Sequence, residues 1–578
     1  MRFVQVRVLS IVLAVFASTV SLESRAAEAA AKPKFGALTQ SFLAEYYADN
    51  PTYAGDLGLH EFDSRIEDVS QAAILAEAAR LKRWHEEFTA IDPGTLGLTE
   101  RLDREFLLRE IESRLINIED VRAWARDPDL YSSELTNSAF ALIKRDYAPA
   151  AERLRSVIAR EKAMPATLGH ARRNLVNPPR IYTQIAIEQI DGNIDFFKTA
   201  VVEALADVDD AALKAEFKRT NDAVIAALGE YKDWLQKDLL PKSNGSFAYG
   251  ADLYRRKLAA AEMIDLPLER LLQIAEADLR SNQEQFTAAA RKIDPAHSPR
   301  EVLDALQKIH PAPDKLLATT QAELDAIGHF MIEHHIVTVP AAEPATVKET
   351  PPFMRATTSA SMDTPGPFEK KAMHGYYNMT LPDPAWGPAE TEDFMRQWFP
   401  ELITNVSVHE VWPGHYLQFL YAKQFPSDVR RVFGSNANIE GWAHYCEQMV
   451  LDEGFHDGDP RYRLAQLQDA LLRDARFIVG IRLHTQGMTI EQAQDFFERE
   501  AFQPRPVAVS ETKRGTSDAL YGYYTMGKLA ILKLRADYRA KRGAAYSLQG
   551  FHDEFLQLGP LPLPLMREAM LGERGQML

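Results

Sequence analysis

Apolar residues recur at intervals of three and four positions through most of the chain between residues 40 and 294. The pattern is clearest over residues 72–88, 99–114, 150–163 and 268–290, and little of this region alternates with the period of two that is typical of a strand. Spacing of three and four places the apolar side chains on one face of a helix. We therefore expect a succession of packed helices and a mainly α fold.

A proline-rich segment interrupts the helical pattern. Nine prolines lie between residues 329 and 388. Because proline lacks the amide hydrogen that a helix interior needs, long helices are excluded there. Residues 336–339 and 375–380 are rich in residues that favour strands. We expect a small β-sheet with irregular loops over residues 330–390, between an N-terminal helical half and a C-terminal, catalytic half over residues 391–578.

The chain contains no internal repeat and no segment with the composition of a flexible linker. We therefore expect residues 27–578 to form one large, bilobed helical domain rather than a row of independent domains. The small sheet is expected near the cleft between the two halves.

The first 26 residues carry the three-part pattern of a secretory signal peptide. Two arginines fall within residues 1–7, an apolar run fills residues 8–22, and small residues follow. The run is shorter than the ~20 residues of a permanent membrane helix, although a retained anchor is the alternative. We expect cleavage after Ala26 and an exported protein, periplasmic or secreted, that no longer associates with the membrane.

Charge and cysteine content narrow the possible partners. The 578 residues include 66 Lys and Arg against 82 Asp and Glu, a formal net charge of −16. Nucleic acid is not an expected partner, because binding its phosphates requires a basic surface. The single cysteine, Cys446, excludes an intramolecular disulfide, so a chain of this length must be stabilised by its apolar core.

The segment HEVWPGH, which begins at His409, carries the clearest chemistry. In the related pattern H-E-x-x-H, two histidines on one helical face bind zinc and the glutamate acts on a water molecule. Here His409 and His415 are six residues apart, which on a straight helix separates their directions by about 240°. Removing Pro413 and Gly414 restores the pattern, and this dipeptide favours a kink. We expect a helix with a two-residue bulge, both histidines as zinc ligands, and Glu410 as general base.

A catalytic zinc commonly takes a carboxylate beside two histidines and keeps its fourth position for water. Glu440 is the best candidate for this ligand, because it follows His415 by 25 residues and fits a second helix that returns antiparallel to the first. His444 lies one turn further along. We expect it to hydrogen-bond a zinc ligand and orient it, with direct coordination by His444 as the alternative.

The two segments HEVWPGHYLQ and EGWAHYCEQM resemble the signatures of the bacterial domain-of-unknown-function-885 family, H-E-x-x-P-G-H and E-G-W-A-x-Y. That family in turn resembles the gluzincin metallopeptidases, helical enzymes in which H-E-x-x-H is followed by a liganding glutamate at a similar spacing. The resemblance implies a helical metallopeptidase with one Zn²⁺ in a deep cleft and short peptides as substrates.

A third segment, residues 513–527, is similar to a C-terminal pattern of the same family but lacks its Pro-Gly-Gln. Tyr524 matches a fixed position of that pattern, and the resemblance implies that its hydroxyl stabilises the oxyanion of the reaction. Tyr521 and Tyr523 remain alternatives. Arg514, in the same segment, is a candidate for binding substrate.

Tyr377 and Asn378 lie in the expected strand over residues 375–380. In the peptidases that this chain resembles, an edge strand pairs with the backbone of the substrate, which makes both residues candidates for substrate binding. A strand buried in the core is the alternative.

These features predict hydrolysis of peptide bonds in short peptides by a metal-activated water, with Glu410 as general base. One alternative is a non-catalytic exported protein that binds zinc or a peptide. The other is a zinc hydrolase of non-peptide amides or esters, because the same chemistry serves both. The presence of Glu410 beside the candidate ligands favours catalysis over binding alone.

Overall fold

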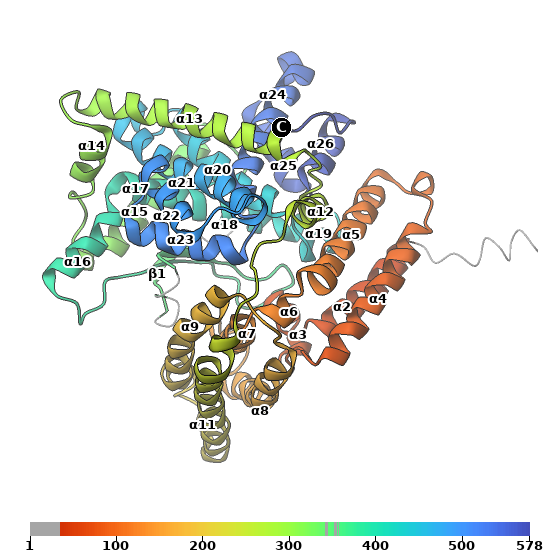
Figure 1. Ribbon diagram of the computed structural model, residues 1–578. Coiled ribbons are helices and arrows are strands. Elements are labelled where there is room, and N and C mark those ends of the chain that lie inside the picture. Colours follow the sequence, from red (N-terminus) through yellow and green to blue (C-terminus); the bar gives the residue numbers. More distant parts are fainter. Residues whose placement is uncertain (1–34, 341–344, 352–354, 356–357) are drawn as a thin grey trace, which may run out of the picture.

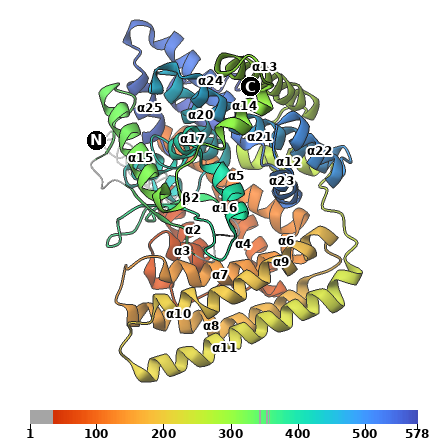
Figure 2. The ribbon, with the colours of Figure 1, turned by 90° about the vertical axis from the view of Figure 1, so that its left-hand side faces the viewer.

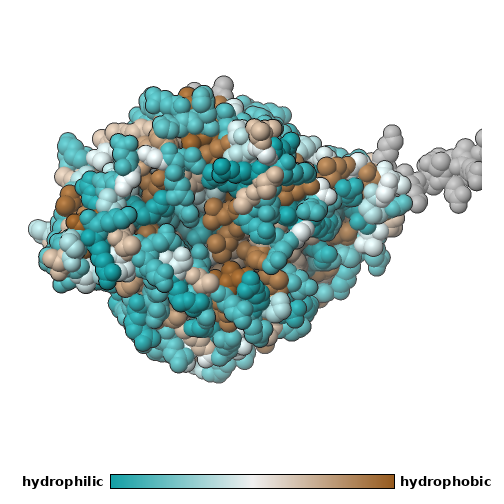
Figure 3. All heavy atoms as spheres, turned by 90° about the horizontal axis from the view of Figure 1, so that it is seen from above, coloured by the Kyte–Doolittle hydropathy of each residue, from teal (hydrophilic) through white to brown (hydrophobic). Residues whose placement is uncertain are grey.

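The computed structural model describes residues 35–340, 345–351, 355 and 358–578, and Figure 1 shows them as a mainly helical protein. The predicted fold class is confirmed, whereas the expected signal peptide over residues 1–26 lies outside the described residues. Within the described part of the chain, no helix is both long and apolar enough to span a membrane. The surface seen from above is largely hydrophilic, with apolar residues gathered near its centre (Figure 3).

One lobe consists of helices between residues 123 and 234 and lies at the bottom of Figures 1 and 2. Its helices are α6 (Ala123–Arg126), α7 (Asp129–Ile143), α8 (Ala150–Asn174), α9 (Arg180–Lys198), α10 (Ala200–Ala204) and α11 (Ala211–Trp234). Both α7 and α11 pack against α8 and α9. Their apolar faces enclose a hydrophobic core that is separate from that of the remaining chain.

The other helices surround a larger core. They are α2 (Phe35–Asp49), α3 (Pro51–Asp56), α4 (Gln71–Thr89), α5 (Leu98–Ile116), α12 (Ala251–Glu262), α13 (Leu268–Ile293), α14 (Pro299–Leu306), α15 (Leu316–Glu333), α16 (Pro388–Met395), α17 (Pro400–Glu410), α18 (His415–Tyr421), α19 (Asp428–Val432), α20 (Asn436–Asp452), α21 (Pro460–Thr485), α22 (Ile490–Glu500), α23 (Arg505–Ser517), α24 (Tyr523–Arg542), α25 (Leu548–Gln557) and α26 (Leu563–Leu571). Within this group α20 packs along α24, and α13 packs along α21. All four segments predicted from periodicity lie in helices, namely α4, α5, α8 and α13.

The two lobes do not coincide with the expected N-terminal and C-terminal halves. The first helices of the chain share the larger core with the C-terminal ones, and the smaller lobe is formed by the residues between them. Tyr46 of α2 packs edge-to-face on Phe433, with ring centroids 5.0 Å apart. The buried guanidinium of Arg430 donates to Asp103 of α5 at 2.7 Å. Such contacts join segments that are more than 300 residues apart in the sequence.

The proline-rich segment forms the expected small sheet. Its strands are β1 (Thr346–Glu349), β2 (Ala360–Asp363) and β3 (Tyr376–Met379), and β3 lies between a parallel β1 and an antiparallel β2. The sheet contacts α15 and α17. The prediction of a strand over residues 336–339 is wrong. The backbone of this segment bonds to side chains of α25 instead of to a neighbouring strand: Ile336 O accepts from His552 and Thr338 N donates to Asp553.

Candidate metal centre

The helix that carries His409 is broken before it reaches His415. α17 ends at Glu410 and α18 begins at His415, so residues 411–414 form a turn between two helices. The two-residue bulge expected from the sequence is therefore a complete interruption of the helix, located at the predicted Pro-Gly dipeptide.

Hydrogen bonds across this turn show how the extra residues are accommodated. The amide of Gly414 donates to the carbonyl of Val408 at 3.0 Å, and the amide of Leu417 donates to that of Val411 at 3.3 Å. Both bonds span six residues, whereas a regular helix spans four. A Cβ atom on Gly414 would lie 1.9 Å from the carbonyl oxygen of His409, so a side chain cannot be accommodated there.

Residues of α20 close to Glu440 hold this turn in place. The indole N–H of Trp442 donates to the carbonyl of Pro413 at 2.8 Å, and the thiol of Cys446 lies 3.8 Å from the same oxygen. A Cβ on Gly441 would lie 2.4 Å from Cα of Gly527, so this glycine lets α20 and α24 approach closely. In the E-G-W motif, Glu440 is thus a candidate ligand, Gly441 allows the close contact between helices, and Trp442 anchors the turn.

The helix break brings His409 and His415 together with Glu440. Their Nε2 atoms lie 3.5 and 3.4 Å from Oε2 of Glu440, and one ligand atom from each residue lies within 4.8 Å of the other two. Bonds of about 2.0–2.1 Å to a tetrahedral zinc would place adjacent ligand atoms roughly 3.3–3.4 Å apart. The donor set of two imidazoles and one carboxylate therefore fits zinc, with the fourth position left for water or substrate.

Electrostatics at Glu440 also suit a cation. Its Oε2 atom is buried and has no hydrogen-bond partner among the described residues. Burial raises the pKa of this carboxyl, but the imidazoles of His415 and His409 outweigh burial and hold the pKa well below its ordinary value. Glu440 is thus an anion at neutral pH, and a bound cation would satisfy its unpaired oxygen.

A buried carboxylate orients His409 from behind. Glu447 Oε1 lies 2.7 Å from Nδ1 of His409 and 2.9 Å from Nη2 of Arg473. Burial raises the pKa of Glu447, but the opposing effect of Arg473 and His444 is larger, so the net shift of this pKa is strongly downward. An ionised Glu447 accepts the Nδ1 proton of His409, which leaves Nε2 free to bind a metal.

His444 hydrogen-bonds Glu447 rather than a candidate zinc ligand, which contradicts the role predicted for it. Its Nδ1 lies 3.1 Å from Oε2 of Glu447, and burial lowers its pKa to about 3, so the neutral ring donates to that carboxylate. The sequence prediction assigned the orienting role to the residue one turn after Glu440. Glu447, two turns after Glu440 on the same helical face, has that role instead, and its spacing of seven was the signal available in the sequence.

Tyr524 reaches the cluster from α24. The centroid of its ring lies 6.4 Å from that of His409. Burial and the nearby carboxylate of Glu440 raise the pKa of Tyr524, so its hydroxyl is protonated at neutral pH and can donate a hydrogen bond.

Arg514 links the two neighbouring tyrosines. Its Nη2 atom lies 3.1 Å from the hydroxyl of Tyr523 and 3.3 Å from that of Tyr524, and it also contacts Asp518 at 3.1 Å. The structure thus places Arg514 and both tyrosines beside the cluster. The hydroxyl of Tyr521 instead packs against Gly515, so this alternative is not supported by the geometry.

The strand that carries Tyr377 and Asn378 cannot pair with a substrate backbone. Both edges of β3 are occupied by neighbouring strands, and the two residues are buried. The expected edge-strand role is therefore wrong, and the core alternative is correct. Burial raises the pKa of Tyr377 and outweighs the hydroxyl of Ser407, which lowers it, and the charge of Glu410 adds a smaller upward shift.

The fold and the cluster define a mainly helical protein with a two-histidine, one-glutamate centre at a broken helix. A family described as bacterial protein of unknown function (DUF885) matches residues 51–570. The chain belongs to the DUF885 family, as its two motifs predict.

Two solved structures have the same fold. A protein of Shewanella oneidensis, provisionally described as a lipoprotein of unknown function, is 28% identical, with a TM-score of 0.78 over 93% of this chain and 100% of its own. A protein of Colwellia psychrerythraea with the same provisional lipoprotein description is 18% identical, with a TM-score of 0.73 over 93% of this chain and 98% of its own. No curated protein matches the chain significantly. The resemblance to gluzincin metallopeptidases is not tested by these matches and stays a prediction.

Proposed function

We propose that this protein is an exported zinc-dependent hydrolase that cleaves peptide bonds in short peptides. The proposal depends on the convergence of His409, His415 and Glu440, because the distances from Oε2 of Glu440 to both imidazoles match those in a tetrahedral zinc site. Glu410, directly after the first ligand in the sequence, supports catalysis rather than storage of the metal. The N-terminal pattern and the lipoprotein description of the structural neighbours support export.

Zinc held by this cluster would polarise the scissile carbonyl and lower the pKa of a water molecule. The carboxylate of Glu410 takes a proton from the attacking water as the new carbon–oxygen bond forms, and delivers it to the amine nitrogen as the carbon–nitrogen bond breaks. The hydroxyl of Tyr524 donates to the oxyanion that develops on the carbonyl. Glu447 keeps the ring of His409 in the required tautomer.

The burial of the centre favours short substrates. His409 and His415 expose only 7% and 9% of their surface. A flexible peptide can extend to such a centre, whereas a folded protein would first have to unfold locally to present a bond there. We therefore expect oligopeptides to be cleaved much faster than intact folded proteins.

The decisive experiment combines metal analysis with digestion of a peptide library. We expect one zinc per chain in the wild type and in Glu410→Gln, with cleavage reduced about 10²–10⁴-fold by the substitution. Tyr524→Phe should retain zinc and lose about 10²-fold in rate. Glu453→Gln, which removes a partly exposed carboxylate after the end of α20, is the matched control.

Two outcomes would overturn parts of this proposal. Cleavage by Glu410→Gln at the wild-type rate would eliminate the general-base role. Zinc binding without hydrolysis of any library peptide by the wild type would favour a metal-binding protein or a hydrolase of other amides and esters.

A further inference from the structure

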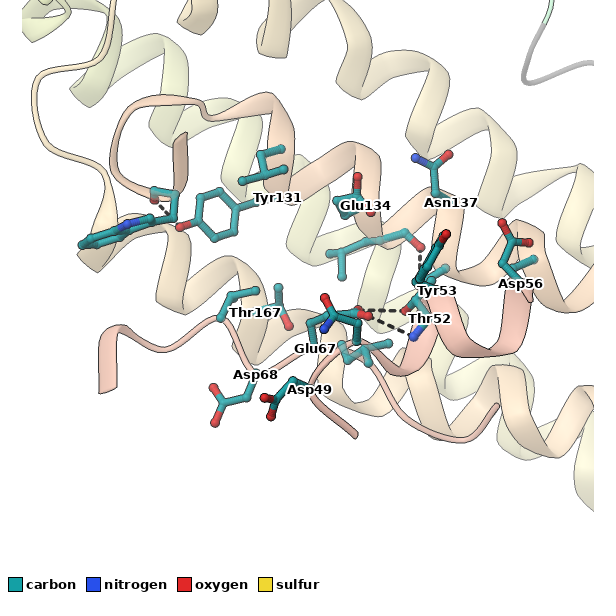
Figure 4. A pocket seen from close by; sticks show the side chains of 18 of the residues that line it. Asp49, Thr52, Tyr53, Asp56, Glu67, Asp68, Tyr131, Glu134, Asn137 and Thr167 are labelled. Atoms are coloured by element: carbon teal, nitrogen blue, oxygen red, sulfur yellow. Dashed lines mark hydrogen bonds between the residues drawn. The ribbon is translucent and has the colours of Figure 1, made fainter. Parts of the chain in front are cut away.

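A cavity of about 590 Å³ lies at the junction of the two hydrophobic cores and shares no lining residue with the metal centre. It is enclosed by α7 on one side and by α3, α4 and the loop between them on the other (Figure 4). Ile118 of its wall packs against the larger core, whereas Tyr131 and Leu135 belong to the smaller one. A cavity of this size at a junction between lobes has the dimensions of a small-molecule site.

Aromatic and aliphatic side chains form much of the wall. Tyr53 and Tyr131 both line it, and their hydroxyls donate to the backbone carbonyls of Val432 and Trp124. Because these hydroxyls are already engaged, the tyrosines offer ring surface to a ligand rather than a hydrogen-bond donor. Trp124 itself adds a third aromatic ring to the lining.

The lining also carries six carboxylates and one lysine. Three of the carboxylates are neutralised by adjacent cations: Asp49 by Arg80, Asp56 by Lys144 and Glu77 by Arg114. The other three, Glu67, Asp68 and Glu134, form no ion pair among the described residues. The buried Arg160 lies behind the wall, where its guanidinium donates to the carbonyls of Asp63 and Ser138 and is attracted by Glu67. The cavity therefore keeps an excess of negative charge.

Glu134, on α7, is a solvent-exposed member of this group. It lies across the cavity from Glu67, which accepts hydrogen bonds from the amide and hydroxyl of Thr52 at 2.9 and 2.8 Å (Figure 4). The surrounding wall of the cavity, the charge of Glu67 and the charge of Asp129 raise the pKa of Glu134, although its side chain is exposed to solvent. Among the described residues Glu134 has no hydrogen-bond or ion-pair partner. A cation placed between Glu134 and Glu67 would relieve their repulsion.

We propose that this cavity binds a small organic cation, an ammonium group attached to an apolar body. Glu134 and Glu67 would hold the ammonium group, and the rings of Tyr53, Trp124 and Tyr131 would contact the apolar body and the face of the cation. The site is independent of the metal centre, so it adds a second ligand to the protein whichever reaction the metal centre performs.

Titration calorimetry of the zinc-loaded full chain with benzyltrimethylammonium tests the proposal, because this probe carries a permanent charge on an aromatic body. We expect one site per chain, with affinity weakened about tenfold by Glu134→Gln and strengthened by Asn137→Asp, which adds a charge at the cavity wall. Glu203→Gln, an exposed carboxylate of the same lobe outside the cavity, should leave the affinity unchanged. Benzyl alcohol, a neutral probe with the same ring, should bind at least tenfold more weakly.

The proposal is wrong if the wild type shows no saturable binding of the probe, or if Glu134→Gln and the wild type bind it equally. Equal affinity for benzyl alcohol would also overturn it, since the site would then be merely apolar. Asn137→Asp keeps the test valid if Glu134→Gln fails to fold, because a stronger affinity cannot arise from unfolding. Glu410→Gln should bind the probe like the wild type, which separates this result from the fate of the proposed hydrolase.

Discussion

Replacing Glu447 by glutamine tests how the candidate metal centre is supported. The side chain is fully buried, and its oxygens lie 2.7 Å from Nδ1 of His409, 2.9 Å from Arg473 and 3.1 Å from Nδ1 of His444. Glutamine has nearly the same shape but no charge, and its amide nitrogen donates rather than accepts. At least one of the three donors therefore loses its acceptor, and among the described residues Arg473 keeps only Asp469, at 3.5 Å, as a charged partner.

Two magnitudes follow from these contacts. Loss of the carboxylate that orients a metal-binding histidine weakens metal affinity about 10–100-fold. Removing one partner of a buried ion pair destabilises a protein by about 3–5 kcal/mol. Because Asp469 still compensates part of the charge of Arg473, we expect the free energy of unfolding of the zinc-free protein to fall by about 3 kcal/mol, at the lower end of that range.

Zinc affinity is measured by competition with a chromophoric chelator, and stability by urea unfolding of the zinc-free protein. Glu453→Gln is the matched control, since Glu453 follows the end of α20 and pairs with Arg535 at 2.8 Å at a partly exposed site. This control should change stability by less than about 1 kcal/mol and leave zinc affinity unchanged. A folded Glu447→Gln protein with wild-type zinc affinity would refute the orienting role.

Two further predictions concern the turn and a buried acid. Gly414→Ala places a methyl group 1.9 Å from the carbonyl oxygen of His409, so the turn must shift, and we expect at least tenfold weaker zinc binding and a lower melting temperature. Gly229→Ala, at a helical glycine with open space around it, should leave zinc binding unchanged and should not lower the melting temperature. Wild-type zinc affinity in Gly414→Ala would show that the turn tolerates displacement. Glu262 accepts hydrogen bonds from Ser435 and the amide of Ala437, and burial raises its pKa to about 7. The folded state therefore binds this proton more tightly than the unfolded state, and the associated stability is lost as the pH rises from about 4.5 through 7. Glu262→Gln keeps both acceptor contacts and should flatten the dependence of melting temperature on pH between 5 and 8, with a higher melting temperature than the wild type at pH 8; an identical pH slope in both proteins would contradict the shifted pKa.

The sequence alone determined the features that depend on local spacing. Apolar periodicity predicted the helices, because a helical face is defined by residues three and four positions apart. Proline density located the sheet, and the HEVWPGH segment located the candidate ligands and the interruption between them. Glu440 was found in the same way, because its distance from His415 along the chain suits a second helix that returns past the first.

Contacts between distant segments were decided only by the tertiary structure. No local pattern indicates that α2 and α5 pack against the C-terminal helices, because the apolar face of a helix does not specify its partner. The pairing of β3 with both β1 and β2 is a property of the folded sheet and cannot be inferred from the sequence of β3. Because both edges of β3 are paired, Tyr377 and Asn378 are excluded from the candidate substrate site. The orienting role passed from His444 to Glu447 for a similar reason: both lie on the helix of Glu440, and only the position of α17 and of Arg473 on α21 determines which of them meets His409. Spacing along a chain defines which residues can share a face, whereas the packing of helices defines what that face contacts.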